Sequence, residues 1–223
     1  MADNHQVIEN DRLAFPKKFN KMDISSDLRQ IMIEAIISNT DVRIETNDEE
    51  CMYVPKGMSI EVGMIQFLID NEEDIQRQLV DRNKYAPIKI TLPFDQTLKR
   101  KVVVRHCVDN AEYVRIYVKG APEYVIGLCT QTLTSNASKK DGGLSENDQY
   151  ALLQDVVSNQ MASSGLKVLT YAFKEILLED LDNLIQSVNT ESEEFRMELE
   201  ADLVYLGTFG LEDPLRPDIE KSI

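Results

Sequence analysis

The sequence has few of the residues on which zinc sites and histidine-based catalytic sites depend. It contains no tryptophan, three cysteines and two histidines among 223 residues. The cysteines, Cys51, Cys107 and Cys129, are odd in number and show no C-x-x-C spacing, which argues for a reducing compartment and against a disulfide framework or a zinc site. His5 and His106 are too few for a histidine-based metal cluster or a Ser–His–Asp triad. The acidic clusters at 48–50 and 70–74 lack the D-x-[DN]-x-[DN]-G calcium-loop pattern, so we predict no metal site in this chain.

Long apolar runs are also missing. No uninterrupted run approaches the roughly 18–20 residues that a membrane-spanning helix needs, and the polar start of the chain is unlike a signal peptide. We therefore expect no direct membrane contact by this chain. The sequence has no G-x-x-x-x-G-K-[ST] phosphate loop, no G-x-G-x-x-G after a strand and no G-x-S-x-G elbow. The commonest nucleotide-binding loops are thereby excluded.

Charge is plentiful but unevenly spread. The net charge of −15 opposes nonspecific binding to nucleic acid, so we expect no nucleic-acid partner. Residues 179–202 carry nine acidic residues and one basic residue, whereas residues 94–120 carry six basic and three acidic residues. A basic island in an acidic protein is a candidate anion site. On charge alone, however, the favoured interpretation of residues 94–120 is a solvated basic face of a sheet.

Apolar residues at helical spacing predict several helices. The first is expected to begin at Ser25 or Ser26, because apolar residues follow it at helical spacing. Others are expected from Gly57, around residues 74–82, over residues 145–161 and over residues 181–188. The helix at 145–161 opens with a capping-box pattern, in which a serine is followed three residues later by an aspartate.

Alternating apolar residues predict strands in the middle and at the end of the chain. We expect strands at residues 88–92, 168–173 and 203–209, and a β-hairpin over residues 102–118 that turns at Asp109-Asn110. The polar segments 1–20, 39–50 and 189–202 are expected to be a lead-in, a loop with at most a short strand, and an acidic loop. The pattern predicts a mixed α/β fold of the α+β style, with helices packed on a twisted, mainly antiparallel sheet.

One short segment favours a ligand-binding role. Lys119-Gly120-Ala121-Pro122-Glu123 places a lysine at the end of a predicted strand, followed by a glycine that lets a ligand approach the backbone closely. Taken alone, however, the segment is better explained as a plain strand-to-helix turn in which Pro122 begins a short helix.

Four further segments occur in order around it. They are Gly57-Met-Ser-Ile-Glu-Val-Gly63, Phe94-Asp-Gln-Thr-Leu-Lys-Arg100, Met161-Ala-Ser-Ser-Gly-Leu-Lys-Val-Leu169 and Gly210-Leu-Glu-Asp-Pro-Leu-Arg-Pro217. With the lysine–glycine segment they resemble the nucleotide-binding domain of P-type cation-transporting ATPases. The glycine at position 63 and the residues of the last segment look closest to those of calcium pumps of the plasma-membrane type.

The resemblance implies an ATP site on the adenine side. Phe94 would stack on the adenine ring, Glu61 would accept a hydrogen bond from the adenine amino group, and Leu169 would close the apolar wall. From the residues alone, each has a structural alternative: Phe94 and Leu169 as core residues, and Glu61 as a surface helix residue.

The resemblance also implies a phosphate side. Lys99 and Lys119 would face the phosphates, Gly120 would line the pocket, and Lys167 stands where the family has an arginine. Each lysine could instead be a solvated charge. Two further departures, Ile60 for threonine and Leu98 for arginine, keep open the alternative of an interaction domain that has lost nucleotide binding.

The family's nucleophile motif D-K-T-G-T and its magnesium motifs T-G-D and G-D-G-x-N-D are absent. The resemblance therefore implies a chain with no catalytic residues of its own, which binds ATP without hydrolysing it and uses Mg²⁺ only in the intact protein. No nucleophile–base pair supports a third alternative, a stand-alone small-molecule enzyme.

The resemblance also implies a domain plan. Residues 1–20 would lead in from a phosphorylation domain of the same parent chain, residues 21–209 would bind the nucleotide, and residues 210–223, with Asp213 and Arg216, would form the returning hinge. The whole would be a cytosolic domain of an integral membrane protein.

Overall fold

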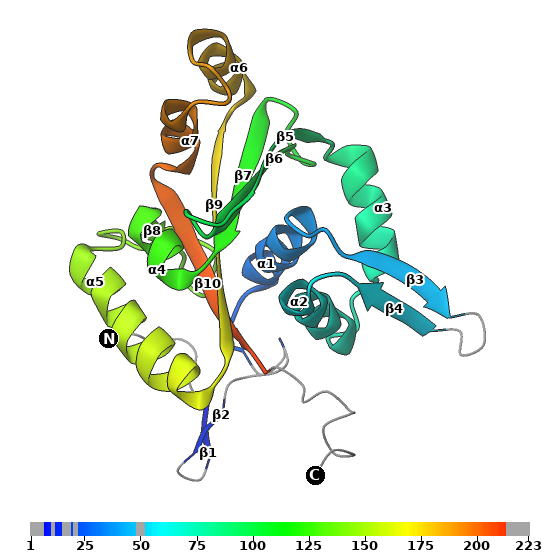
Figure 1. The fold of residues 1–223 in the computed structure, drawn as a ribbon, viewed down its shortest axis with the longest axis vertical. Helices are drawn as coiled ribbons and strands as arrows, with labels where there is room; N and C mark the ends of the chain where they lie inside the picture. The colour runs from blue at the N-terminus through cyan, green and yellow to red at the C-terminus, as the bar shows by residue number, and fades with distance from the viewer. Residues whose placement is uncertain (1–6, 10–11, 15–18, 20–21, 48–51, 213–223) are drawn as a thin grey trace.

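A six-stranded sheet forms the centre of the molecule (Figure 1). The computed structural model describes residues 7–9, 12–14, 19, 22–47 and 52–212. The strand order is β5-β6-β7-β9-β10-β8, and every neighbouring pair is antiparallel except β8 with β10. The strands are β5 (Ile88–Asp95), β6 (Arg100–His106), β7 (Tyr113–Gly120), β8 (Cys129–Thr132), β9 (Lys167–Leu177) and β10 (Leu203–Leu211). The predicted mixed fold with a mainly antiparallel sheet is confirmed.

Helices cover both faces of this sheet, and two small hairpins stand beside it. The helices are α1 (Ser26–Ser38), α2 (Ser59–Asp70), α3 (Ile75–Tyr85), α4 (Pro122–Val125), α5 (Glu146–Ala151), α6 (Leu178–Ser187) and α7 (Glu193–Glu200). The hairpins are β1 (Val7–Glu9) with β2 (Arg12–Ala14), and β3 (Arg43–Asn47) with β4 (Met52–Lys56). A 3₁₀ turn over Ile126–Leu128 follows α4, and α5 continues through a π-helical stretch over Leu152–Met161 into a 3₁₀ turn over Ala162–Ser164. None of the helices in the described part of the chain is both long and apolar enough to cross a membrane.

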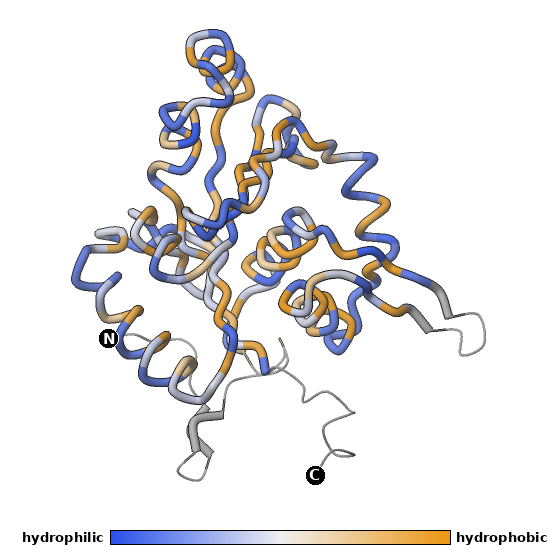
Figure 2. The backbone as a smooth tube through the Cα atoms, in the orientation of Figure 1, coloured by the Kyte–Doolittle hydropathy of each residue, from blue (hydrophilic) through white to orange (hydrophobic). Residues whose placement is uncertain are grey.

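Alternation along the strands sorts the core into two clusters. Val114, Ile116 and Val118 of β7 face α4, α6 and α7, where they pack with Phe195 and other apolar residues. Tyr117, on the opposite face, packs with residues of α1 and α2. Figure 2 shows apolar colour concentrated on the central strands and mixed colour on the outer helices. The sheet is therefore buried on both faces, and the α1–α2 face is the one that carries charge.

The predicted helix starts are confirmed where caps exist. The Ser25 hydroxyl accepts a hydrogen bond from the Leu28 amide at 3.2 Å, and Ser145 and Asp148 form the reciprocal capping box. Pro122 is at the start of α4, as predicted for a residue that lacks an amide hydrogen. Local hydrogen bonding within a few residues therefore sets these helix boundaries.

Three polar segments carry more regular structure than predicted. Residues 189–202 were expected to be an acidic loop, which is wrong, because they contain α7. Ser192 caps that helix, and Phe195 and Leu199 are fully buried, so two apolar residues four apart are enough to dock an otherwise acidic helix. Strands β3 and β4 pair where at most a short strand was expected, and β1 and β2 pair within the predicted lead-in.

Gly120 ends β7 where the backbone of β6 comes very close. A Cβ atom added to Gly120 would lie 2.4 Å from the Lys99 carbonyl oxygen and 2.9 Å from the Arg100 Cα. Arg100 is the register partner of Gly120, and the Ala121 amide donates to the Lys99 oxygen at 3.0 Å. The neighbouring backbone of the protein itself therefore takes up the space beside this glycine.

We expect Gly120→Ala to lower the free energy of unfolding by about 1–3 kcal/mol, because backbone atoms cannot move aside as a flexible side chain can. Chemical denaturation measures the change. Gly127→Ala is the matched control, since a Cβ there meets nothing within 4 Å, and it should stay within about 0.5 kcal/mol of the parent. Equal stability of the two variants would contradict this account of Gly120.

Candidate functional site

The strand register brings the sequence motifs to one end of the sheet. Asp95 on β5 pairs with Arg100 on β6, Arg100 pairs with Gly120 on β7, and Gly120 pairs with Thr170 on β9. The segments around Phe94, Lys119 and Leu169 therefore lie side by side at this end of the sheet, although they are far apart in the chain. With neighbouring strands about 4.8 Å apart, the row of strand ends spans roughly 15 Å from β5 to β9.

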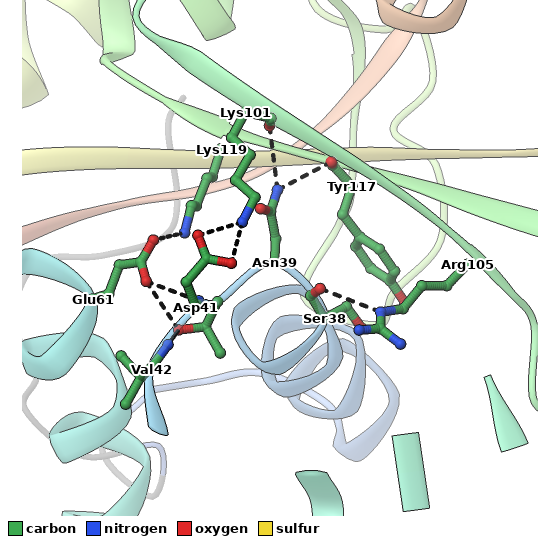
Figure 3. Close-up of polar contacts among 10 residues, drawn as sticks. Ser38, Asn39, Asp41, Val42, Glu61, Lys101, Arg105, Tyr117 and Lys119 are labelled. Carbon is green, nitrogen blue, oxygen red and sulfur yellow. Dashed lines mark hydrogen bonds and ion pairs between the residues drawn. The ribbon is translucent and has the colours of Figure 1, made fainter. Parts of the chain in front are cut away.

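Glu61 and Lys119 form a buried ion pair between α2 and β7 (Figure 3). Their side chains are 3% and 6% exposed, and the Lys119 Nζ donates to Glu61 Oε1. The other carboxylate oxygen accepts from the Asp41 amide at 2.9 Å and from the Thr40 hydroxyl at 3.3 Å. Burial lowers the pKa of Lys119, and the charge of Glu61 opposes that shift. Glu61 is thus a buried residue that binds three donors of the protein, and the surface-helix alternative for it is wrong.

A second ion pair lies beside the first and was missed from sequence. Lys101 is the register partner of Lys119, and its Nζ lies 2.6 Å from both carboxylate oxygens of Asp41. Burial alone would raise the pKa of Asp41, but the hydrogen bond and charge of Lys101 bring it below its ordinary value. The strand alternation offered a signal, because Lys101 and Arg105 share the phase opposite to Val102 and Val104 of β6.

Buried polar groups also fasten α1 to the sheet in this region (Figure 3). Asn39 is fully buried and donates to the carbonyl oxygens of Lys101 and Tyr117 at 3.3 and 3.1 Å. Arg105 donates to the Ser38 carbonyl at the end of α1 and to the Ala86 carbonyl at the end of α3. A cation is favourable there, because the last carbonyls of a helix lack intrahelical donors. Burial and the nearby charge of Arg82 lower the pKa of Arg105 to about 10.

Phe94 and Lys99 flank a tight turn between β5 and β6. The Asp95 carboxylate accepts from the Thr97 and Leu98 amides at 2.7 and 2.9 Å, and the Lys99 amide donates to the Asp95 carbonyl at 2.8 Å. Lys99 is exposed with φ of 51°, and Phe94 is 49% exposed. The core alternative for Phe94 is therefore wrong, and an exposed aromatic ring stands beside a basic turn.

Lys167 and Leu169 occupy the start of β9. Lys167 is exposed, whereas Leu169 is 7% exposed and belongs to the apolar cluster between the sheet and α1 and α2. Both follow the same alternation as Tyr171, which pairs with Lys119 across β7 and β9. Leu169 is therefore a core residue at the same end of the sheet as the buried ion pairs.

The basic island of residues 94–120 is not a solvated face, so that interpretation from charge alone is wrong. Lys101, Arg105 and Lys119 are each 5% exposed or less. The reason is that α1 and α2 cover this face of the sheet and supply the acceptors described above. The predicted hinge residues Asp213 and Arg216 lie outside the described residues.

A separate cavity of about 660 Å³ opens beside the first half of α1. It is lined by residues that include Phe19, Arg29 and Glu73, and Arg29 both pairs with Glu73 and lies over the Phe19 ring. None of the predicted site residues lines this cavity. It is therefore not the space that the sequence motifs predict.

The comparison with protein families gives the class of this domain. The family model of the P-type ATPase cytoplasmic domain N matches residues 27–218, which is most of the chain. The chain therefore belongs to the P-type ATPase family and corresponds to its cytoplasmic domain N, as the ordered motifs predicted.

Individual relatives are named as calcium-transporting or sodium/potassium exporting ATPases. A calcium-transporting ATPase of Plasmodium falciparum is 29% identical over 142 residues, which cover 64% of this chain and 10% of the relative. Plasma membrane calcium-transporting ATPase 3 of Rattus norvegicus is 25% identical over 174 residues, which cover 75% of this chain and 12% of the relative. Sodium/potassium exporting P-type ATPase 1 of Saccharomyces cerevisiae is 32% identical over 132 residues, which cover 59% of this chain and 11% of the relative. The chain thus spans only about a tenth of the length of these relatives.

The buried pair of Glu61 and Lys119 yields a stability prediction. Glu61→Gln should lower the free energy of unfolding by about 3–5 kcal/mol, because it leaves Lys119 as an uncompensated buried cation. The double variant Glu61→Gln with Lys119→Met should cost less than the sum of the two single changes. Asp182→Asn is the control, since its partner Lys89 and Asp182 itself are 24% and 45% exposed; it should cost about 1 kcal/mol or less. Strict additivity in the double variant would contradict the pairing.

The turn that carries Phe94 and Lys99 should respond to acid. Two backbone hydrogen bonds to its carboxylate lower the pKa of Asp95 below its ordinary 3.8. Because the folded pKa is the lower one, the stabilisation is complete above pH 3.8 and is lost as the pH falls through the folded pKa. NMR titration should show the Thr97 and Leu98 amide shifts moving with a midpoint below 3.8, and Asp95→Asn should remove that step. A midpoint at or above the ordinary value would mean that the turn does not form in solution.

Proposed function

We propose that this chain is the ATP-binding domain of a P-type cation-transporting ATPase. The transported cation is calcium, for which several of its relatives are named. Membership of the family supports the proposal, and one structural observation carries it. The register of β5, β6, β7 and β9 gathers the motif residues at one end of the sheet, next to the buried Lys101 and Lys119. A planar base and a chain of phosphates need that combination of aromatic and cationic groups.

The residue roles follow from exposure and charge. Phe94, half exposed at the end of β5, offers a ring on which the adenine stacks. Lys99 and Lys167 are exposed cations at the same end of the sheet, where they attract the phosphates. Leu169 forms the apolar wall of the site, next to these residues. Gly120 keeps β7 close to β6, and so holds the turn in place.

Glu61 has a more specific part in this proposal. A carboxylate has about four acceptor positions, and Glu61 uses three of them for Lys119, Thr40 and the Asp41 amide. The adenine amino group takes the remaining position or displaces one of these donors. Displacement of Lys119 would free its ammonium for a phosphate. A guanine carbonyl placed there would repel the carboxylate, so adenine is preferred.

The parent protein completes the reaction. The chain holds the nucleotide and presents its γ-phosphate to an aspartate on a separate phosphorylation domain, with Mg²⁺ required in the intact pump. In-line attack and metal bridging belong to phosphoryl transfer and not to adenine binding. Residues 210–223, with Asp213 and Arg216, would then be the hinge to that domain, and the whole would be a cytosolic part of an integral membrane protein.

A second function is an interaction domain that keeps this fold without binding nucleotide. It is favoured by the departures at Ile60, Leu98 and Lys167 and by the engagement of both Glu61 oxygens with protein donors. Titration with nucleotide separates the two functions, since only one of them requires saturable, base-selective binding.

Titration of the chain with ATP, ADP and GTP, followed by amide chemical shifts, tests the proposal. ATP and ADP should bind with similar affinity, because the base dominates recognition, and GTP should bind more weakly. Phe94→Ala should weaken ATP binding by about 1–3 kcal/mol, by analogy with the stacking of bases on aromatic residues. The matched control is Tyr150→Ala, which removes a ring that is 67% exposed on α5, and it should leave the affinity unchanged.

Two results would overturn the proposal. The first is an absence of saturable shift changes with any nucleotide, which would favour the interaction domain. The second is equal weakening in the Phe94 and Tyr150 variants, which would mean that the ring at position 94 has no special role.

A further inference from the structure

The turn between β5 and β6 is bound to α7, which lies about a hundred positions further along the chain. The Arg100 Nε donates to Glu200 Oε2 at 2.8 Å, and its Nη2 donates to the same oxygen. The side chains of Arg100 and Glu200 are 12% and 1% exposed. Arg100 also places its Nη1 3.3 Å from the Leu98 carbonyl oxygen, inside the turn. The Arg100 side chain therefore connects the turn to the end of α7.

A second residue of α7 reaches the other side of the same turn. The Arg196 Nη2 lies 3.5 Å from the carbonyl oxygen of Pro93, the residue before Phe94, and the Arg196 Nε lies 3.6 Å from Glu200 Oε1. Arg196 and Glu200 are four residues apart and so share one face of α7. This face therefore contacts the strand before the turn directly and the strand after it through Arg100.

The helix that carries these two residues is itself firmly fixed. Phe195 and Leu199 are fully buried in the apolar cluster on the α4–α7 face of the sheet. Their neighbours in sequence, Arg196 and Glu200, consequently have little freedom to follow a moving turn. A rigid support of this kind pre-organises a binding loop, which lowers the entropy cost of binding.

The charges of the cluster make Glu200 its critical member. One carboxylate faces two guanidinium groups, and the Glu200 Oε1 and Arg196 Nη1 atoms have no hydrogen-bond partner among the described residues. Without the carboxylate, two poorly solvated cations would repel each other beside the turn. The contacts from Arg100 and Arg196 to the turn would then be lost together.

We propose that α7 clamps the β5–β6 turn, with Arg196 and Glu200 as positioning residues that hold Phe94 and Lys99 ready for the nucleotide. Neither residue touches the ligand; each acts through the backbone of Pro93 or through Arg100. The inference rests on the proposed function for its effect on ATP, but the clamp itself is a property of the apo chain.

Hydrogen exchange measures the clamp without any ligand. The Thr97, Leu98 and Lys99 amides all donate to Asp95 within the turn, so their exchange rates report its opening. Glu200→Gln and Arg196→Gln should each speed their exchange by about tenfold, a change that corresponds to the loss of one charge-assisted hydrogen bond. The Ile116 amide, in the centre of β7, should be unaffected. Glu194→Gln, an exposed acid of the same helix, is the control and should change neither rate.

ATP titration of the same variants gives the second measurement. We expect Arg196→Gln to raise the Kd for ATP about tenfold, like the exchange rates, and Glu194→Gln to leave it unchanged. Arg196→Gln decides the question if Glu200→Gln unfolds, because it keeps the pair of Arg100 with Glu200. Unchanged exchange at residues 97–99 in folded Arg196→Gln would overturn the clamp. So would an acceleration at residues 97–99 that the Ile116 amide shows to the same extent, because the variant would then loosen the whole sheet and not the turn. If the parent chain binds no ATP, the proposed function fails, while the exchange rates still decide the clamp.

Discussion

Charge buried on one face of the sheet is the constraint on which the rest of this structure depends. Lys101, Arg105 and Lys119 project from neighbouring strands into a space that α1 and α2 cover, and each is almost inaccessible to water. A buried cation is tolerated only with an acceptor at short range. The acceptors are Asp41, Glu61 and the carbonyl groups at the ends of α1 and α3. Helix placement and strand register are therefore fixed together, because a shift of either would separate the charges.

In the proposed function, the same constraint prepares one end of the sheet for an anion. The ion pairs hold β6 and β7 against α2, and the absence of a side chain at Gly120 lets the backbone of Lys99 and Arg100 pack directly beside it. Phe94 and Lys99 remain outside this network and exposed. A rigid, charged interior next to an exposed aromatic and basic turn suits a ligand that has a flat base and a phosphate chain.

The two faces of the sheet have different roles. The face toward α1 and α2 carries the polar network, whereas the face toward α4, α6 and α7 is almost wholly apolar and supplies mechanical support. Arg100 and Glu200 connect the supporting helix α7 to the turn beside the charged edge. In the proposed function, apolar packing and ligand recognition are thus divided between the two faces and coupled at the β5–β6 turn.

Local signals in the sequence determined the fold class and most element boundaries. Capping residues such as Ser25 and Ser145, the alternation along β7, and the proline at the start of α4 each act within a few residues, so they can be identified without tertiary information. The ordered motifs determined the family in the same way, since motif order is a property of the chain. Helix α7 was missed because its acidic composition outweighs the two buried residues, Phe195 and Leu199, that dock it.

Only the tertiary structure decided which charges are buried and what they bind. Lys101 and Lys99 are two positions apart, yet one pairs with Asp41 under a helix and the other is exposed on a turn. From the residues alone Glu61 could be a surface residue of a helix, but the packing of α2 against β7 buries it beside Lys119. Burial depends on which segments cover a residue, and those segments are distant in the sequence. The resemblance therefore named the candidate residues, and the packing of helices on the sheet decided which of them are buried and what they contact.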